Sequence, residues 1–186
     1  MRRMEVLRTL VSQLRVEDVV ISCYSPTCHE LYAIGDRERN FYVRDSMGLP
    51  TSIGLGLALA LPERRVVVLE GDGGLLMNLG SLATISNKSP PNLLLIVLDN
   101  GCYENTGGQP TATAKRTDLE KIAKGAGIQK AFTIKSTENL TKILKQNGPG
   151  PVFVVAKIER GRADVPPIPL QHIENKYRFV RALRSS

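Results

Sequence analysis

Long apolar runs are scarce in this sequence of 186 residues. None reaches the roughly 20 residues that a membrane-spanning helix requires. The N-terminal segment, residues 1–18, carries basic residues but no long apolar core, so we interpret it as an amphipathic helix rather than a secretion signal. We therefore expect a protein that has no membrane partner and lies in the cytoplasm.

Cysteine is also scarce, with Cys23, Cys28 and Cys102 as its three positions. The number is odd and no pair has CxxC spacing. These facts argue against a disulfide framework and against a zinc or iron–sulfur site. We expect reduced thiols with structural roles.

Two common phosphate-binding motifs are missing, since the chain has neither GxxxxGK[ST] nor GxGxxG. The net charge of +7 comes without a nucleic-acid recognition motif. The basic residues are dispersed, so a solvated basic surface is the main interpretation, with an anionic ligand or an acidic partner chain as the alternative. We predict no nucleic-acid partner.

What the chain does contain is a regular alternation of short apolar runs and segments with a helical pattern. Strands that are apolar on both faces and alternate with helices are typical of a parallel sheet covered on both sides. The predicted fold class is therefore α/β, as one domain over residues 1–186 with a helical arm at about 165–186. The expected strands are residues 19–24, 41–43, 65–70, 92–99, 131–134 and 150–158, and the expected helices are residues 1–18, 49–61, 75–86, 117–127 and 137–148.

Two local expectations are more specific. Residues 26–40 are predicted to be a loop with at most one helical turn. Thr117, with Glu120 three residues later, has the pattern of a capping box at the start of a helix.

A carboxylate and an amide follow two of the predicted strands. Asp72 comes just after one strand and Asn100 just after the next, so both belong at the edge where parallel sheets bind ligands. Carboxylate and amide oxygens suit Mg²⁺, and glycines with helix N–H groups suit a phosphate. A lone Gly-Asp-Gly can simply form a turn, but the pairing with Asn100 favours a magnesium–diphosphate site.

The segment GDGG and the later DNG together resemble the signature of thiamine diphosphate enzymes. The longer strings FYVRDSMGLPTSIGLGLALALPERRVVVLEGDGG, LLLIVLDNGCYENTGGQPTAT and VPPIPLQHIENKYRFVRAL resemble the beta subunits of the sulfopyruvate decarboxylase family. Phosphonopyruvate decarboxylases are similar in the same places. The resemblance covers most of the chain and implies a thiamine diphosphate-binding fold.

The resemblance also implies roles for individual residues. Mg²⁺ would be bound by the side chains of Asp72 and Asn100 and by the backbone carbonyl of Cys102. Met47 would lie under the cofactor and bend it, and Glu104 is a further candidate catalytic residue in a loop that meets the substrate. The expected cofactor-binding residues are Asp45, Met47, Gly71, Asp72, Gly73, Gly74, Asn100, Cys102 and Tyr103. Relatives often have glycine in place of Asp45, so that position departs from the pattern.

The implied reaction is the non-oxidative decarboxylation of 3-sulfopyruvate to sulfoacetaldehyde and CO₂, a step in coenzyme M biosynthesis. The substrate is a small anionic 2-oxo acid, and Arg44, Lys115 and Arg116 are candidate partners for its anions. The glutamate that activates the cofactor would come from the pyrimidine-binding domain of an alpha subunit. The resemblance thus implies a hetero-oligomer that is active only with its partner.

Other functions remain open from the sequence. One is a phosphonopyruvate decarboxylase or another 2-oxo acid decarboxylase. A second is the beta subunit of a 2-oxo acid:ferredoxin oxidoreductase, although those chains usually carry more cysteines. A non-catalytic alternative is a thiamine diphosphate sensor, and a basic scaffold for nucleic acid is another.

Overall fold

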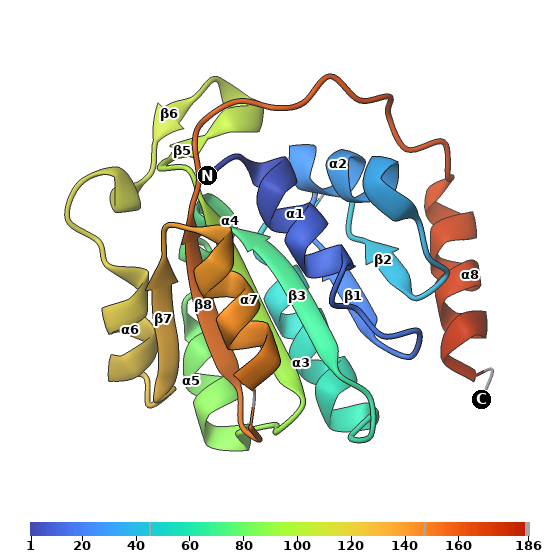
Figure 1. The fold of residues 1–186 in the computed structure, drawn as a ribbon, viewed down its shortest axis with the longest axis horizontal. Coiled ribbons are helices and arrows are strands. Elements are labelled where there is room, and N and C mark those ends of the chain that lie inside the picture. Colours follow the sequence, from blue (N-terminus) through green and yellow to red (C-terminus); the bar gives the residue numbers. More distant parts are fainter. Residues whose placement is uncertain (45, 147, 185–186) are drawn as a thin grey trace.

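A parallel sheet forms the centre of the molecule in this computed structural model, which describes residues 1–44, 46–146 and 148–184 (Figure 1). Its strands, within the described residues, are β1 (Val19–Ser22), β2 (Asn40–Tyr42), β3 (Val66–Gly71), β4 (Leu93–Asp99), β7 (Lys130–Ile134) and β8 (Val152–Lys157). Their order across the sheet is β2-β1-β3-β4-β8-β7, and every neighbouring pair is parallel. The predicted α/β fold is therefore confirmed.

Helices cover both faces of this sheet. They are α1 (Arg3–Val11), α2 (Pro26–Gly35), α3 (Pro50–Ala60), α4 (Asp72–Leu76), α5 (Gly80–Lys88), α6 (Leu119–Gly125), α7 (Thr137–Gln146) and α8 (His172–Arg184). One apolar layer joins the sheet to α3, α5, α6 and α8. The other joins it to α1, α2 and α7, which lie in front of the strands in Figure 1.

The central strands are apolar at successive positions because both faces are buried. Val66 and Val68 of β3 pack into the first layer, whereas Val67 and Leu69 pack into the second. All four side chains are fully buried. Alternate residues of a strand point to opposite faces, so a strand between two helical layers needs apolar residues throughout.

The glycine-containing helix α3 packs closely on β3. A Cβ atom on Gly54 would lie 2.1 Å from Cγ2 of Val68, so only glycine permits this approach. Gly56 faces outward, and a Cβ atom on it would have no atom from outside the helix within 4 Å.

The prediction of a loop at residues 26–40 was wrong, because α2 occupies ten of those residues. Ser25 caps the helix, since its hydroxyl accepts a hydrogen bond from the N–H of Thr27 at 3.1 Å. Pro26 is the first helical residue, where a missing N–H costs nothing. Cys28 and Leu31 are buried against the sheet, and this tertiary packing stabilises the helix.

The predicted helix at residues 75–86 is two helices, α4 and α5, separated by a turn. The side-chain amide of Asn78 in this turn donates to the carbonyl of Gly48 at 2.8 Å and to the hydroxyl of Ser52 at 3.0 Å. The turn therefore holds the segment that carries Met47.

The cap of α6 is Asp118, not Thr117 as the capping-box pattern predicted. The carboxylate of Asp118 accepts a hydrogen bond from the N–H of Lys121 at 3.1 Å. The pattern placed the helix start one residue too early because both residue types serve as caps.

Two further segments complete the edge of the sheet where the strands end. A small antiparallel ribbon pairs β5 (Cys102–Tyr103) with β6 (Gln109–Pro110). Residues 158–171, which we call the strap, then cross above the strand ends to α8, which packs beside β2 (Figure 1). Among the described helices, none combines the length and apolar character of a membrane-spanning segment.

Candidate diphosphate and metal site

The carboxyl ends of β1, β3 and β4 enclose a cavity of about 70 Å³. The described residues that the sequence analysis selected as metal-binding, cofactor-binding or catalytic all line it. They are Met47, Gly71, Asp72, Gly73, Gly74, Asn100, Cys102, Tyr103 and Glu104. Asp45, the remaining predicted residue, lies outside the described residues.

The carboxylate of Asp72 is oriented by two threonines. Its Oδ2 accepts hydrogen bonds from the hydroxyls of Thr111 at 2.6 Å and Thr113 at 2.9 Å. Because both bonds go to Oδ2, Oδ1 is the atom with capacity for a cation.

Asp72 is a buried acid, with only 2% of its surface exposed. Burial raises the pKa of its carboxyl above the ordinary value, and the nearby carboxylate of Asp99 raises it further. Asp99 itself is paired with Lys157, whereas no basic side chain in the described part of the chain pairs with Asp72. A cation at this position would therefore complete the charge balance.

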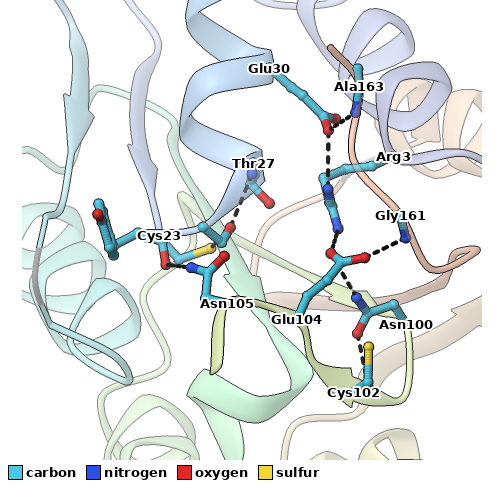
Figure 2. A network of polar contacts seen from close by, with 12 residues as sticks. Arg3, Cys23, Thr27, Glu30, Asn100, Cys102, Glu104, Asn105, Gly161 and Ala163 are labelled. Carbon is cyan, nitrogen blue, oxygen red and sulfur yellow. Dashed lines mark hydrogen bonds and ion pairs between the residues drawn. The ribbon is translucent and has the colours of Figure 1, made fainter. Parts of the chain in front are cut away.

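The side chain of Asn100 is held at both ends of its amide (Figure 2). Oδ1 accepts from the N–H of Cys102 at 3.0 Å, and Nδ2 donates to Glu104 at 3.2 Å. These two partners fix which end of the amide is oxygen. They direct a hard oxygen donor towards the same cavity as Asp72.

The third oxygen of the predicted metal site is the carbonyl of Cys102. Pro110 lies opposite Cys102 in the β5–β6 ribbon and has no N–H to donate to that carbonyl. Among the described residues, no group of three histidine, cysteine, aspartate or glutamate side chains could hold a metal ion. A cation here would thus depend on an amide and a carbonyl as well as on Asp72, a donor set that suits Mg²⁺.

The thiols agree with the expectation of reduced, structural cysteines. Cys23, Cys28 and Cys102 are all buried and free of disulfides. Burial raises the pKa of Cys23 to about 12, so it stays a thiol at neutral pH.

The glycines after Asp72 are required by their neighbours within this chain. A Cβ atom on Gly73 would lie 2.5 Å from the ring of Tyr103, and one on Gly74 would lie 2.3 Å from a carboxylate oxygen of Glu70. The sequence analysis explained these glycines by the approach of a phosphate. The close packing of Tyr103 and Glu70 is a second and independent reason.

Glu70 is a site residue that the sequence analysis missed. Its Oε1 accepts from the N–H of Gly71 at 3.1 Å, while Oε2 is buried without a hydrogen-bond partner among the described residues. Burial raises the pKa of this carboxyl to about 8, so it is mostly protonated at pH 7. The sequence placed Glu70 at the end of an apolar strand and gave no sign of this environment.

Glu104, a predicted catalytic residue, belongs to a network of polar contacts (Figure 2). Its carboxylate accepts from Arg3, from the amide of Asn100 and from the N–H of Gly161. Arg3 also donates to Glu30 at 3.1 Å, and Arg3 is only 5% exposed. Arg3 lies 101 positions from Glu104 in the chain, so no sequence motif could connect them.

Met47, the other predicted catalytic residue, stands at the edge of the cavity with 41% of its surface exposed. Gly48 follows it with a φ of +78°, a left-handed conformation that glycine adopts without strain.

The three basic residues named as candidate partners for the anions of the substrate are not among the residues that line this cavity. Arg44 donates to the carbonyl of Leu170 at 2.9 Å. Lys115 and Arg116 are exposed in the segment before α6.

Comparison with known proteins places this chain in a family. Residues 21–156 match the profile of the thiamine pyrophosphate enzymes, C-terminal TPP-binding domain. Sulfopyruvate decarboxylase subunit beta of Methanocaldococcus jannaschii is 40% identical over the whole chain and 98% of its own length.

Longer relatives match over part of their length. Sulfopyruvate decarboxylase of Methanosarcina acetivorans is 40% identical over 98% of this chain and 47% of its own. Phosphonopyruvate decarboxylase of Streptomyces viridochromogenes is 38% identical over 87% of this chain and 41% of its own.

Solved structures give the same fold at lower identity. A putative thiamin diphosphate-dependent enzyme from Mycobacterium smegmatis has a TM-score of 0.75 at 23% identity, over 87% of this chain and 32% of its own. A 4-hydroxybenzoylformate decarboxylase from Rhodococcus jostii RHA1 has a TM-score of 0.76 at 18% identity, over 88% of this chain and 33% of its own. The chain therefore belongs to the thiamine pyrophosphate enzymes and, within them, to the decarboxylase family of the sulfopyruvate decarboxylase beta subunits.

Proposed function

We propose that this chain is the diphosphate-binding subunit of a sulfopyruvate decarboxylase. The reaction is the conversion of 3-sulfopyruvate to sulfoacetaldehyde and CO₂, in coenzyme M biosynthesis. One observation carries the proposal. Asp72, buried without a basic partner among the described residues, shares a cavity with the oriented amide of Asn100 in a chain of this family.

The residues at this cavity fit Mg²⁺ and the diphosphate of thiamine diphosphate. Oδ1 of Asp72, Oδ1 of Asn100 and the carbonyl of Cys102 would hold the metal. The backbone of Gly71, Gly73 and Gly74 would lie along the diphosphate, and Asp45, Met47 and Tyr103 would contact the rest of the cofactor. Thiamine diphosphate supplies the electron sink that the loss of CO₂ from a 2-oxo acid requires.

The chain's own contribution is to hold these ligands in place. Thr111 and Thr113 fix the carboxylate of Asp72. Glu104 fixes the amide of Asn100 and is itself held by Arg3. We therefore assign Glu104 a positioning role instead of direct contact with the substrate. Partners of this kind typically change metal affinity by about 10- to 100-fold.

A partner alpha subunit would supply the pyrimidine-binding domain and the glutamate that activates the cofactor. The residues that line the cavity are those expected at the metal and the diphosphate, so the two rings of the cofactor would extend beyond it. The exposed apolar residues around Gly48 support a surface that the partner subunit covers. Met47, Leu49 and Met77 are 41%, 47% and 59% exposed. We also propose that residues 1–186 act as one domain in a hetero-oligomer.

The decisive experiment is CO₂ release from sulfopyruvate, with phosphonopyruvate and pyruvate alongside. The sample is this chain combined with its candidate alpha subunit, Mg²⁺ and thiamine diphosphate, and Asp72→Asn is the control. We expect turnover of sulfopyruvate that the control lacks. Preference for phosphonopyruvate would instead favour the activity named for the Streptomyces relative. Cofactor binding without any turnover would favour a sensor.

A further inference from the structure

A second and larger cavity, of about 590 Å³, adjoins the proposed cofactor cavity. The start of α2 forms one side of it and residues 162–167 of the strap form the other. The two cavities have four wall residues in common. These shared residues are Tyr24, Ser25, Pro26 and Asn105. A molecule held at the first cavity can therefore extend into the second without crossing a separate wall.

His29 gives this second cavity a fixed hydrogen-bond donor. Its Nδ1 accepts from the backbone N–H of Ile168 at 3.2 Å, which places the ring proton on Nε2. Burial lowers the pKa of His29, and the charges of Arg44 and Arg162 lower it further. The ring is thus neutral at pH 7, and Nε2–H is available to an acceptor.

Arg162 brings a positive charge to the same wall. No carboxylate pairs with it within the described part of the chain. The nearest acid on α2, Glu30, is already bound by Arg3 and by the N–H of Ala163. Asp164 is the one acid among the residues that line the cavity, and it is exposed to solvent.

The backbone around Arg162 is held firmly by side chains of the main body. Glu104 accepts from the N–H of Gly161, and Glu30 accepts from the N–H of Ala163 (Figure 2). Arg162 lies between these two anchors, so polar contacts on both sides fix its backbone, and its side chain is exposed to solvent at the cavity wall.

We propose that the second cavity binds the tetrahedral oxyanion at C3 of the substrate, with Arg162 as its charge partner and His29 as a neutral donor. The inference rests on the proposed function, since it describes how that site selects its substrate. A sulfonate and a phosphonate share this chemistry, because each offers several oxygens to the planar donors of a guanidinium. Pyruvate lacks the group and gains nothing from Arg162.

The kinetic test uses the assembled enzyme with Arg162→Gln. Arg8→Gln is the matched control, because Arg8 is exposed on α1 and is not among the residues lining either cavity. We expect KM for sulfopyruvate to rise by about 10- to 100-fold in Arg162→Gln, the usual effect of losing a charged hydrogen bond. For pyruvate, kcat/KM stays within about twofold of wild type. Equal losses for both substrates, or no loss for either, would overturn the proposal.

A binding test separates this inference from the proposed reaction. The full chain is labelled with ¹⁵N and titrated with sulfoacetate, phosphonoacetate and acetate, none of which is a 2-oxo acid. We expect shifts of the Arg162 Nε–H and the Ala163 amide with the first two anions, absent in Arg162→Gln and retained in Arg8→Gln. Half-saturation at a lower concentration of phosphonoacetate than of sulfoacetate would identify the phosphonate as the preferred group. Equal shifts with acetate, or none with any anion, would refute the cavity as an oxyanion site even if sulfopyruvate is turned over.

Discussion

At the scale of single residues, two neutral hydroxyl groups orient the charged carboxylate of Asp72. Thr111 and Thr113 occupy one carboxylate oxygen and leave the other to face the cavity. Hydroxyls add no charge, so they orient the acid without neutralising it. The negative charge of Asp72 therefore remains for a cation.

The first prediction concerns Thr111. Thr111→Val keeps the shape of a buried side chain but removes the 2.6 Å bond to Asp72. We expect the affinity for Mg²⁺, measured by titration with excess thiamine diphosphate, to fall by about 10-fold. Thr84→Val, on the exposed side of α5, is the control. If both variants bind Mg²⁺ as wild type does, the threonine has no positioning role.

The second prediction concerns the buried carboxyl of Glu70. In the folded chain its pKa is about 8, above the ordinary value of 4.5 that applies after unfolding. The stabilising effect of the protonated form is therefore complete below pH 4.5 and is lost as the pH rises towards 8. Glu70→Gln stays neutral and should avoid this loss.

Urea unfolding at pH 5.5 and pH 8.5, without cofactor, tests the prediction about Glu70. Between these two pH values we expect the free energy of unfolding of wild type to fall by a few kcal/mol more than that of Glu70→Gln, since each pKa unit corresponds to about 1.4 kcal/mol. Glu63→Gln, on an exposed residue, should follow wild type. Parallel curves for wild type and Glu70→Gln would show that Glu70 does not titrate as described.

At the scale of elements, Arg3 connects parts of the chain that are distant in sequence. It lies in α1 and contacts Glu30 of α2 and Glu104 of the short 3-10 turn Glu104–Thr106. Both carboxylates also accept backbone N–H groups of the strap. One buried cation thus stabilises four segments around the site.

The third prediction follows from this connection. Arg3→Gln leaves the carboxylates of Glu30 and Glu104 without their cation, so the free energy of unfolding should fall by about 3 kcal/mol. The affinity for Mg²⁺ should fall as well, because Glu104 holds Asn100. Arg8→Gln, in the same helix but exposed, should change neither quantity in urea unfolding and Mg²⁺ titration. Equal stability of the two variants would contradict the prediction.

The fourth prediction uses the two glycines of α3. Gly54→Ala forces a methyl group against the stiff side chain of Val68 and should destabilise the chain by about 1–3 kcal/mol. Gly56→Ala meets open space and should be neutral or stabilising by up to about 1 kcal/mol. Chemical unfolding of both variants checks the difference. Adding Val68→Ala to Gly54→Ala removes the clash, so the second change should cost less stability in this variant than in wild type. An equal cost in both would mean that Val68 is not what excludes a side chain at Gly54.

Elements were predictable from the sequence where apolar pattern decides the structure, and less so where tertiary contacts do. The buried strands and the paired Asp72 and Asn100 follow from local pattern. Helix α2 does not, because its stability comes from a serine cap and from burial of Cys28 and Leu31. The partners of Asp72 and Glu104 were missed for a related reason, since Thr111 and Arg3 lie 39 and 101 positions away from them.

At the scale of the whole molecule, both cavities lie at the same edge of the sheet, above the ends of its strands. The cofactor cavity lies at the ends of the central strands, and the second cavity lies between α2 and the strap. The helices below this edge contribute to the apolar layers and not to these two cavities, apart from the starts of α1, α2 and α4. The apolar layers therefore lie below the cavities, whereas polar contacts such as those of Arg3 stabilise the edge that carries them.

The strap connects β8 near one edge of the sheet to α8 beside β2 at the other edge (Figure 1). Besides the bonds from Gly161 and Ala163, it is attached through Ile168 to His29 and through Leu170 to Arg44. Between these attachments it forms the outer wall of the second cavity, while the sheet beneath is complete without it. Inserting or deleting residues in the strap is therefore a way to change the volume of the second cavity, and with it the proposed choice among substrate acids, without altering Asp72, Asn100 or the apolar core.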